Sequence, residues 1–218
     1  MPSRYSTPLC PVRVKRERRK EARPGELIDA ALDLFVEKGF AATRSEEVAV
    51  RAGVSKGTLF LYFPTKEDLL KAVIVETLSG RFIEWNEEFE AFEGSTADML
   101  RHCVKVWWER VGNTRAAGLT KLMMCEGSNF PELAAFYRQE VVEPGHALMR
   151  RIFRRGIDSG EFVAVDVDHA IYAVIAPMMF LLLMQHSQSI CVDGKSEVDP
   201  LRFMSAQVEL AIRGLRAP

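Results

Sequence analysis

The sequence predicts an all-α fold of about nine helices, and three observations support that prediction. Apolar residues recur at three- and four-residue spacing along most of the 218-residue chain, as they do on one face of an α-helix. Glycine, proline and hydroxyl-bearing residues stand between these periodic stretches, where helices begin and end. No stretch alternates apolar and polar residues between turn signals, as a half-buried β-strand would.

Charge is unevenly distributed along the chain. Residues 1–66 carry 13 Lys and Arg against 8 Asp and Glu, whereas the remaining residues carry 16 against 22. The N-terminal arm, residues 1–23, contains the cations Arg13, Lys15, Arg16, Arg18, Arg19, Lys20 and Arg23. Because few apolar residues offset the entropy of ordering, we expect this arm to be flexible in isolation and to contact phosphates. A solvated tail is the alternative.

Two helices are expected after the arm. The first covers residues 24–38, between a proline that suits a first helical turn and a glycine that suits a helix end. The second begins at residues 43–45, where Thr43 with Glu46, or Arg44 with Glu47, has the spacing of a capping box. Only the first pair offers a hydroxyl that caps well.

The third helix is expected over residues 55–62. Gly53 supplies the left-handed residue that closes the second helix, and Ser55 can cap the third. Two short helices joined by a tight turn that contains glycine form a helix-turn-helix, whose second helix can enter the major groove of DNA. Residues 43–63 are therefore the segment expected to contact DNA.

The rest of the chain is expected to be helical. A long fourth helix starts after Thr65, reaches about residue 92 and bends at Gly80. Further helices are expected over residues 96–111, 114–126, 131–160 with a kink at Pro144, 166–188 and 199–215. No Pro/Ser-rich linker is present, so a DNA-binding domain (24–66) and a ligand-binding and dimerisation domain (67–218) are expected to share the fourth helix.

The residues around the helix-turn-helix resemble the N-terminal domain of the TetR (tetracycline repressor) family. The matching segments are Leu34-Phe35, Gly39-Phe40, Ala52-Gly53-Val54-Ser55-Lys56-Gly57-Thr58-Leu59-Phe60, Tyr62-Phe63 and Lys66-Glu67-Asp68-Leu69-Leu70. The close match covers residues 24–75, and the remainder is similar to the family's regulatory domain in length and helix content. The resemblance implies a homodimeric transcriptional regulator, usually a repressor, that a small ligand releases from its operator.

The resemblance also implies which residues contact double-stranded DNA. They are Lys56, Gly57, Thr58, Leu61 and Tyr62 on the third helix, Thr43, Arg44 and Ser45 at the start of the second, and Lys66 on a phosphate. The chemistry agrees, because Gly57 lacks a side chain that would hold the backbone off the groove and Thr58 can hydrogen-bond a base or phosphate. Arg44 and Leu61 depart from the family's usual residues, so this helix does not indicate an operator sequence.

The last two helices are expected to form a dimer interface. The helix over residues 199–215 is apolar on two faces and therefore needs two partners, and the helix before it is apolar nearly all round. Both facts fit a four-helix bundle between two chains, as in the family, with the interface residues Phe180, Leu181, Met184, Phe203, Gln207 and Leu210. A monomeric core of the same composition is the alternative.

A pocket for a hydrophobic or aromatic small molecule is expected among the middle helices. The candidate residues are Trp107, Trp108, Met123, Met124, Glu126, Phe130 and Tyr137, most of which offer polarizable apolar surface. Each apolar candidate has plain core as its alternative role. Glu126 could meet a cationic ligand or simply lie in solvent at a helix end.

Other classes of protein are not indicated. The chain has no GxSxG, HExxH, Walker or GxGxxG motif, so neither an enzyme nor a cofactor is expected. The four cysteines lack metal-site spacing and are expected to be free thiols in a reducing cytoplasm. A non-specific architectural DNA-binding protein is the alternative function, but it leaves the acidic, apolar C-terminal region without a role.

The sequence also predicts a cytoplasmic protein that does not enter a membrane. Arg and Lys stand where a signal peptide needs an apolar run. The most apolar stretch, residues 170–184, is interrupted by Pro177 and is shorter than the ~18–20 residues of a membrane-spanning helix. We therefore expect it to be a buried helix.

Overall fold

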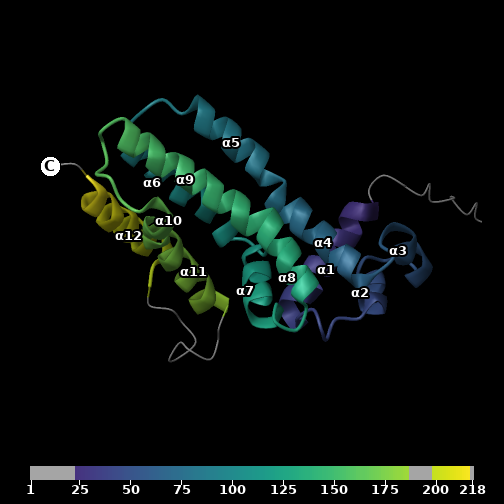
Figure 1. Cartoon of the computed structure of the whole chain (residues 1–218). Coiled ribbons are helices and arrows are strands. Elements are labelled where there is room, and N and C mark those ends of the chain that lie inside the picture. Colours follow the sequence, from purple (N-terminus) through teal and green to yellow (C-terminus); the bar gives the residue numbers. More distant parts are fainter. Residues whose placement is uncertain (1–22, 187–197, 217–218) are drawn as a thin grey trace, which may run out of the picture.

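The structure is a computed structural model that describes residues 23–186 and 198–216. A small head lies at one end of an elongated helical body (Figure 1). The described residues contain no β-strand, and their one β-bridge pairs Phe162 with Arg216. The all-α prediction is confirmed. Residues 1–22 of the basic arm, Cys10 and Cys191 lie outside the described residues.

Three helices form the head, and each begins and ends close to its expected position. They are α1 (Arg23–Lys38), α2 (Ser45–Arg51) and α3 (Lys56–Tyr62). Gly39 and Gly53 have φ values of 88° and 66°, which are left-handed conformations suited to glycine. The hydroxyl of Ser55 accepts the N–H of Thr58 at 3.1 Å and so caps α3.

The body contains the remaining helices. They are α4 (Lys66–Ile74), α5 (Arg81–Ala91), α6 (Thr96–Trp107), α7 (Ala117–Glu126), α8 (Pro131–Tyr137), α9 (Glu143–Asp158), α10 (Val167–Ala170), α11 (Tyr172–His186) and α12 (Pro200–Leu215). Three π-helical turns continue α4, α6 and α8: η1 (Val75–Ser79), η2 (Trp108–Gly112) and η3 (Arg138–Val142).

The π-helical turns lie next to the predicted bends. Pro144 has no N–H for a bond to the preceding turn, and η3 is the wider turn that comes directly before its helix. At the other predicted bend, the N–H of Gly80 donates to the carbonyl oxygen of Val75 at 2.9 Å. The long helices expected over residues 65–92 and 131–160 are therefore present as α-helices joined through π-helical turns.

The larger hydrophobic core joins the head to the body. It contains Leu27 and Phe35 of α1 together with Leu70 of α4 and Leu119 of α7, all of them fully buried. Helix α1 also packs closely on α7, because a Cβ atom placed on Gly118 would collide with Val36. The core thus crosses residue 66, where the sequence predicts a domain boundary. A second core joins α6, α9, α11 and α12.

The expectation that residues 170–184 form a buried helix is wrong. The segment Val167–Gln185 has the length and hydropathy of a membrane span, but only 22% of its most apolar window is buried. Helix α11 buries Val174, Leu181 and Leu182, whereas Tyr172 and Phe180 are exposed. The apolar composition thus covers more of the helix surface than one chain's core uses.

Candidate DNA-binding and effector sites

The helix-turn-helix presents part of α3 to solvent. Lys56 and Gly57 are exposed, and Leu61 is 78% exposed, whereas Leu59 is fully buried beneath them. Thr58 and Tyr62 are half-buried, and the Thr58 hydroxyl lies 2.9 Å from that of Ser55. The exposed face is thus poor in free hydrogen-bonding groups, as expected from Leu61, and the roles of these residues in DNA contact stay predictions.

Lys56 is not an isolated cation. Its ammonium group forms an ion pair with Glu46 on α2, and both side chains are more than half exposed. A DNA phosphate would have to replace this carboxylate, which solvent screening makes inexpensive for an exposed pair. Arg44 is exposed and Ser45 half-buried, so the start of α2 is also accessible.

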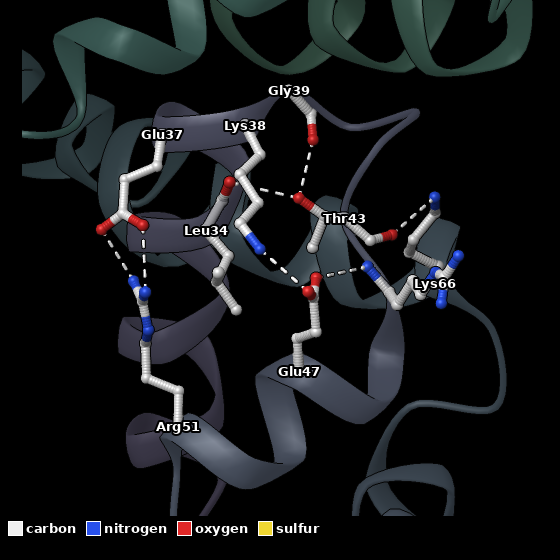
Figure 2. A network of polar contacts seen from close by, with 9 residues as sticks. Leu34, Glu37, Lys38, Gly39, Thr43, Glu47, Arg51 and Lys66 are labelled. Atoms are coloured by element: carbon white, nitrogen blue, oxygen red, sulfur yellow. Dashed lines mark hydrogen bonds and ion pairs between the residues drawn. The ribbon is translucent and has the colours of Figure 1, made fainter.

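Thr43, which the sequence predicts to contact DNA, has a buried side chain, so its role in DNA contact stays a prediction for its backbone only. Thr43 is 1% exposed, and its hydroxyl donates toward the carbonyl oxygens of Gly39 at 2.7 Å and Leu34 at 3.1 Å (Figure 2). The N-cap of α2 is Arg44, whose N–H donates to the Glu47 carboxylate at 3.3 Å. The hydroxyl of Thr43 thus holds the turn after α1 and is not available to cap α2 or to bind DNA.

Lys66 also bonds within the chain, where the family resemblance places a phosphate contact. Its ammonium group donates to the carbonyl oxygens of Phe40 at 2.7 Å and Thr43 at 3.0 Å. It also lies 4.3 Å from the centre of the Phe40 ring, a cation–π distance. Figure 2 shows Lys66 pointing at the turn from the side of α4. In this structure Lys66 supports the residues that precede α2.

Glu126 supports the same turn from the body. Its carboxylate accepts the N–H of Phe40 at 3.2 Å and that of Ala41 at 3.0 Å. The space for this carboxylate depends on Gly39, since a Cβ atom there would overlap the Glu126 Oε1 atom. The 39–43 turn is therefore held by a carboxylate on its amides and by the Lys66 ammonium on its carbonyls. The structure does not support the prediction of Glu126 as a ligand contact, because its carboxylate bonds this turn.

Two exposed ion pairs connect α1 to α2 (Figure 2). Arg51 donates to both carboxylate oxygens of Glu37, at 2.7 and 3.0 Å, and Lys38 donates to Glu47 at 2.8 Å. The hydrogen bond from Arg51 lowers the pKa of Glu37, and that from Lys38 lowers the pKa of Glu47. These pairs fix the angle of α2 but contribute little stability because they are exposed.

The body contains a cavity of about 430 Å³. It lies among α5, α6, α7, α8, α9 and α11 and is lined almost entirely by apolar and aromatic side chains. Three of the seven predicted ligand residues line it: Trp107, Met124 and Tyr137. Its size is within the range of small-molecule sites.

The other four predicted ligand residues do not line the cavity. Trp108 and Met123 are buried in the two hydrophobic cores. Phe130 packs edge-to-face on Phe40 with ring centres 4.8 Å apart, and Glu126 bonds the 39–43 turn. Neighbouring residues on a helix point in different directions, so only one of each pair Trp107/Trp108 and Met123/Met124 faces the cavity.

The sequence interpretation missed the aromatic side of the cavity. Phe82, Trp85, Phe89 and Phe92 all line it, and all belong to α5 or the residue after it. Their spacing of three, four and three residues places them on one helix face. Helix α5 has no fully buried residue. The sequence signal that could have indicated this wall was an aromatic stripe on a helix that connects two domains.

A few polar groups also line the cavity. Glu88 forms an ion pair with Arg110, with nitrogen and oxygen 2.6 Å apart, and lies 3.6 Å from the Nε2 atom of His102. Burial, with a smaller contribution from Glu88, raises the pKa of the Cys103 thiol to about 11, so this cavity cysteine is not an activated nucleophile. Burial and then the charge of Arg150 lower the pKa of His146. Among the described residues no cluster of His, Cys, Asp and Glu is arranged to hold a metal ion.

Helices α11 and α12 carry an exposed apolar surface. It includes Phe180, Leu201 and Leu210, each more than half exposed, and the Phe180 ring lies 6.2 Å from that of Phe203. Of the other predicted interface residues, Met184 and Gln207 are half-buried. The prediction of Leu181 is wrong in this chain's structure, because its side chain is 2% exposed within the second core.

Two family profiles match the chain. One, described as bacterial regulatory proteins of the tetR family, matches residues 27–73. The other, described as the tetracyclin repressor-like C-terminal domain, matches residues 93–190. The first contains the helix-turn-helix, and the second covers most of the cavity and α11.

Curated relatives are regulators. The fatty acid metabolism regulator protein of Bacillus subtilis is 25% identical over 201 residues, 90% of this chain and 98% of the relative. The regulator RutR of Escherichia coli is 47% identical over 64 residues, which are 29% of this chain and 30% of RutR.

Solved structures share the fold over nearly the whole chain. FadR of Bacillus subtilis in complex with stearoyl-CoA is 26% identical with a TM-score of 0.71, covering 87% of this chain and 98% of FadR. The fatty acid degradation regulator FadR of Bacillus halodurans, at 21% identity and a TM-score of 0.72, covers 89% of this chain and 97% of that one.

Proposed function

The chain belongs to the TetR family of bacterial regulatory proteins, and from that premise we propose a repressor whose effector carries a long apolar chain, as an acyl-CoA does. As a member of this family it is a ligand-responsive DNA-binding transcriptional regulator. The effector class and the residues of each site are the parts that we propose.

The observation that carries the effector class is the apolar cavity. Its walls are formed by aromatic, aliphatic and thioether side chains, which suit an alkyl chain better than a sugar or a nucleotide. A related regulator of 26% identity binds stearoyl-CoA. A coenzyme A group is polar and charged, so it would lie outside this cavity while the acyl chain fills it.

We propose that a second copy of the chain packs on the apolar surface of α11 and α12. Phe180 and Leu210 are exposed residues of that surface. Burying them between two copies removes apolar area from water and fixes the separation of the two heads. Heads about 34–36 Å apart can enter successive major grooves on one face of DNA.

The proposed path from cavity to head runs along α7. Thr120 and Met124 line the cavity, and Glu126 on the same helix accepts the amides of the 39–43 turn. A helix rises about 1.5 Å per residue, so Thr120 and Glu126 are about 9 Å apart along this helix. An effector that binds better to one position of α7 shifts the head accordingly.

A DNA-release experiment tests this function. Fluorescence anisotropy would measure binding to the protein's own upstream DNA and to a scrambled duplex, with and without palmitoyl-CoA. We expect specific binding that weakens with salt and is reversed by palmitoyl-CoA but not by coenzyme A alone. Equal affinity for both duplexes would contradict operator binding, and unchanged affinity with palmitoyl-CoA would contradict the effector class.

Catalysis is not part of the proposal, and the proposed location is the cytoplasm. Both parts are supported by the character of the relatives, which are transcriptional regulators of bacteria. A regulator acts where its DNA lies.

A further inference from the structure

The cavity contains a pair of buried hydroxyl groups. Thr120 on α7 and Tyr137 on α8 both line it, at 9% and 8% exposure, and their hydroxyl oxygens are 2.8 Å apart. The neighbouring cavity walls are mainly apolar. A polar pair in such surroundings is energetically unfavourable unless its hydrogen-bonding groups are used.

The hydrogen bonds of the pair do not use both of its protons. Each hydroxyl has one proton to donate, and the bond between them uses one. Within the described part of the chain this is the one hydrogen bond recorded for either hydroxyl. One proton of the pair is therefore left to donate into the cavity.

A second unused donor belongs to the same cavity. Trp85 lines it, and within the described residues the indole Nε1 atom of Trp85 is buried without a hydrogen-bond partner. An indole nitrogen can only donate. The Nε1 atom itself is inaccessible, so of these two donors it is the spare proton of the hydroxyl pair that a bound molecule with an acceptor atom would engage.

The charge of the cavity limits what the acceptor can be. No Lys or Arg is among the described residues that line it, and its one lining carboxylate, Glu88, is already paired with Arg110. Of the lining histidines, His102 lies beside Glu88, and burial lowers the pKa of His146 and so favours its neutral form. A carboxylate buried in the apolar part of the cavity would therefore lose its hydration without gaining a Lys or Arg partner. Burial also raises the pKa of Tyr137 to about 12, so its hydroxyl remains a donor at neutral pH.

We propose that the Thr120–Tyr137 pair is an acceptor-recognition subsite that binds an uncharged carbonyl oxygen of the effector. For an acyl-CoA this oxygen is the thioester carbonyl, and a free fatty acid carboxylate is disfavoured. The inference rests on the proposed function, because it assigns a subsite within the proposed effector cavity. It also explains how an apolar cavity distinguishes an acyl thioester from other chains of equal length.

A matched pair of probes isolates this contact. Palmitoyl-CoA has the thioester carbonyl, whereas hexadecyl-CoA is a thioether with the same chain length and no carbonyl. Isothermal titration would measure both with the full-length protein, with Tyr137→Phe, and with the double variant Thr120→Val/Tyr137→Phe. Ser128→Ala, which removes an exposed hydroxyl outside the cavity lining, is the control.

We expect the wild-type protein to bind palmitoyl-CoA roughly 10-fold more tightly than hexadecyl-CoA, the magnitude of one buried hydrogen bond. The ratio should fall in Tyr137→Phe, approach one in the double variant and stay at its wild-type value in the control. Retained affinity for hexadecyl-CoA shows that a variant is folded. Tyr137→Phe changes shape least and serves if the double variant does not fold.

Three outcomes overturn the inference in distinguishable ways. A wild-type ratio of one, or a ratio that persists in the variants, rejects the subsite while leaving an acyl effector in place. Tighter binding of palmitate than of palmitoyl-CoA rejects the uncharged acceptor. Absence of binding of both coenzyme A probes to the wild-type protein rejects the acyl effector itself, and with it the subsite.

Discussion

Three residues show that side-chain type alone does not determine a role. Thr43, Lys66 and Glu126 were expected to contact DNA or ligand, yet all three bond the 39–43 turn or lie in it. A buried hydroxyl, an ammonium group and a carboxylate satisfy backbone groups that would otherwise lack partners. We therefore expect them to affect DNA binding through the position of α2 and α3.

Thr43→Val tests the structural role of the buried hydroxyl. The substitution keeps the shape but leaves the carbonyl oxygens of Leu34 and Gly39 without this donor. We expect a loss of about 1–2 kcal/mol in the free energy of unfolding, measured by urea denaturation. Thr114→Val, whose hydroxyl bonds a carbonyl in a more exposed turn, is the comparison. A Thr43→Val protein as stable as wild type would contradict the assigned role.

Lys66→Ala separates support of the turn from direct phosphate contact. A lost phosphate contact reduces the slope of log affinity against log salt by about 0.9. Since Lys66 donates to Phe40 and Thr43, we expect weaker operator binding with an unchanged slope. Lys56→Ala, which removes an exposed cation, should reduce the slope. A reduced slope in Lys66→Ala would instead support a direct contact between Lys66 and a DNA phosphate.

At the scale of elements, helix periodicity predicted which segments are helical but not which side of each helix faces the core or the cavity. The segments expected over residues 65–92, 131–160 and 166–188 as single helices are divided in the structure, the first two at π-helical turns that follow Ile74 and Tyr137 and the third after Ala170. Hydrophobic spacing could not tell Trp107 from Trp108 or Met123 from Met124, since adjacent residues differ by 100° around the axis. The α5 aromatics were missed because a cavity wall and a core stripe have the same spacing.

The start of helix α6 is capped by a residue that lies far away in the sequence. The carboxylate of Glu161 accepts the N–H groups of Thr96 at 2.6 Å and Ala97 at 2.8 Å, at the start of α6. Burial alone raises the pKa of Glu161, but the hydrogen bonds from Ala97 and Thr96 bring it below its ordinary value. Its contribution to stability is therefore present at neutral pH and is lost as the pH falls through that lowered pKa.

Glu161→Gln tests this cap by its pH dependence. We expect the variant to be about 1 kcal/mol less stable than wild type at pH 7, as for other lost caps. The difference should shrink as the pH falls through the lowered pKa of Glu161, because the wild-type carboxyl then becomes protonated and loses its charge. Chemical denaturation at a series of pH values measures this difference in the free energy of unfolding. A difference independent of pH would contradict the role of the charge.

Substitutions of Glu126 test the proposed path along α7 from the cavity to the head. Glu126→Gln keeps an acceptor for one amide of the 39–43 turn, whereas Glu126→Ala keeps none. We expect operator affinity to fall in the order wild type, Gln, Ala, while palmitoyl-CoA binds all three equally, as thermal shift would measure. Effector release should be least steep in Glu126→Ala. Equal operator affinity in all three proteins would remove α7 from the path.

At the scale of the whole molecule, the exposed surface of α11 and α12 predicts the assembly. Leu210→Asp places a charge on this surface, and we expect a shift from dimer to monomer in light scattering at micromolar concentration. Ile83→Glu, at an equally exposed apolar residue on α5, should leave the mass unchanged. A dimer that persists in Leu210→Asp would place the interface elsewhere.

The assembly was predictable from the sequence only in outline. A helix that is apolar on two faces indicates a partner, but its sequence does not show which face packs within its own chain. Leu181 illustrates this, because it is buried within its own chain while its neighbour Phe180 is exposed. Assigning each residue to a face required the packing of α11 against α7 and α12, which depends on distant parts of the chain.

The close fit of Val36 against Gly118 limits how freely this head could be exchanged with another. Regulators are often treated as interchangeable modules, in which one protein's head is fused to another's sensor. Here α1 and α7 share a core, and any side chain at position 118 would meet Val36. A working chimera would therefore need to carry the α7 surface along with the head, because the boundary that matters is three-dimensional and does not coincide with a point in the sequence.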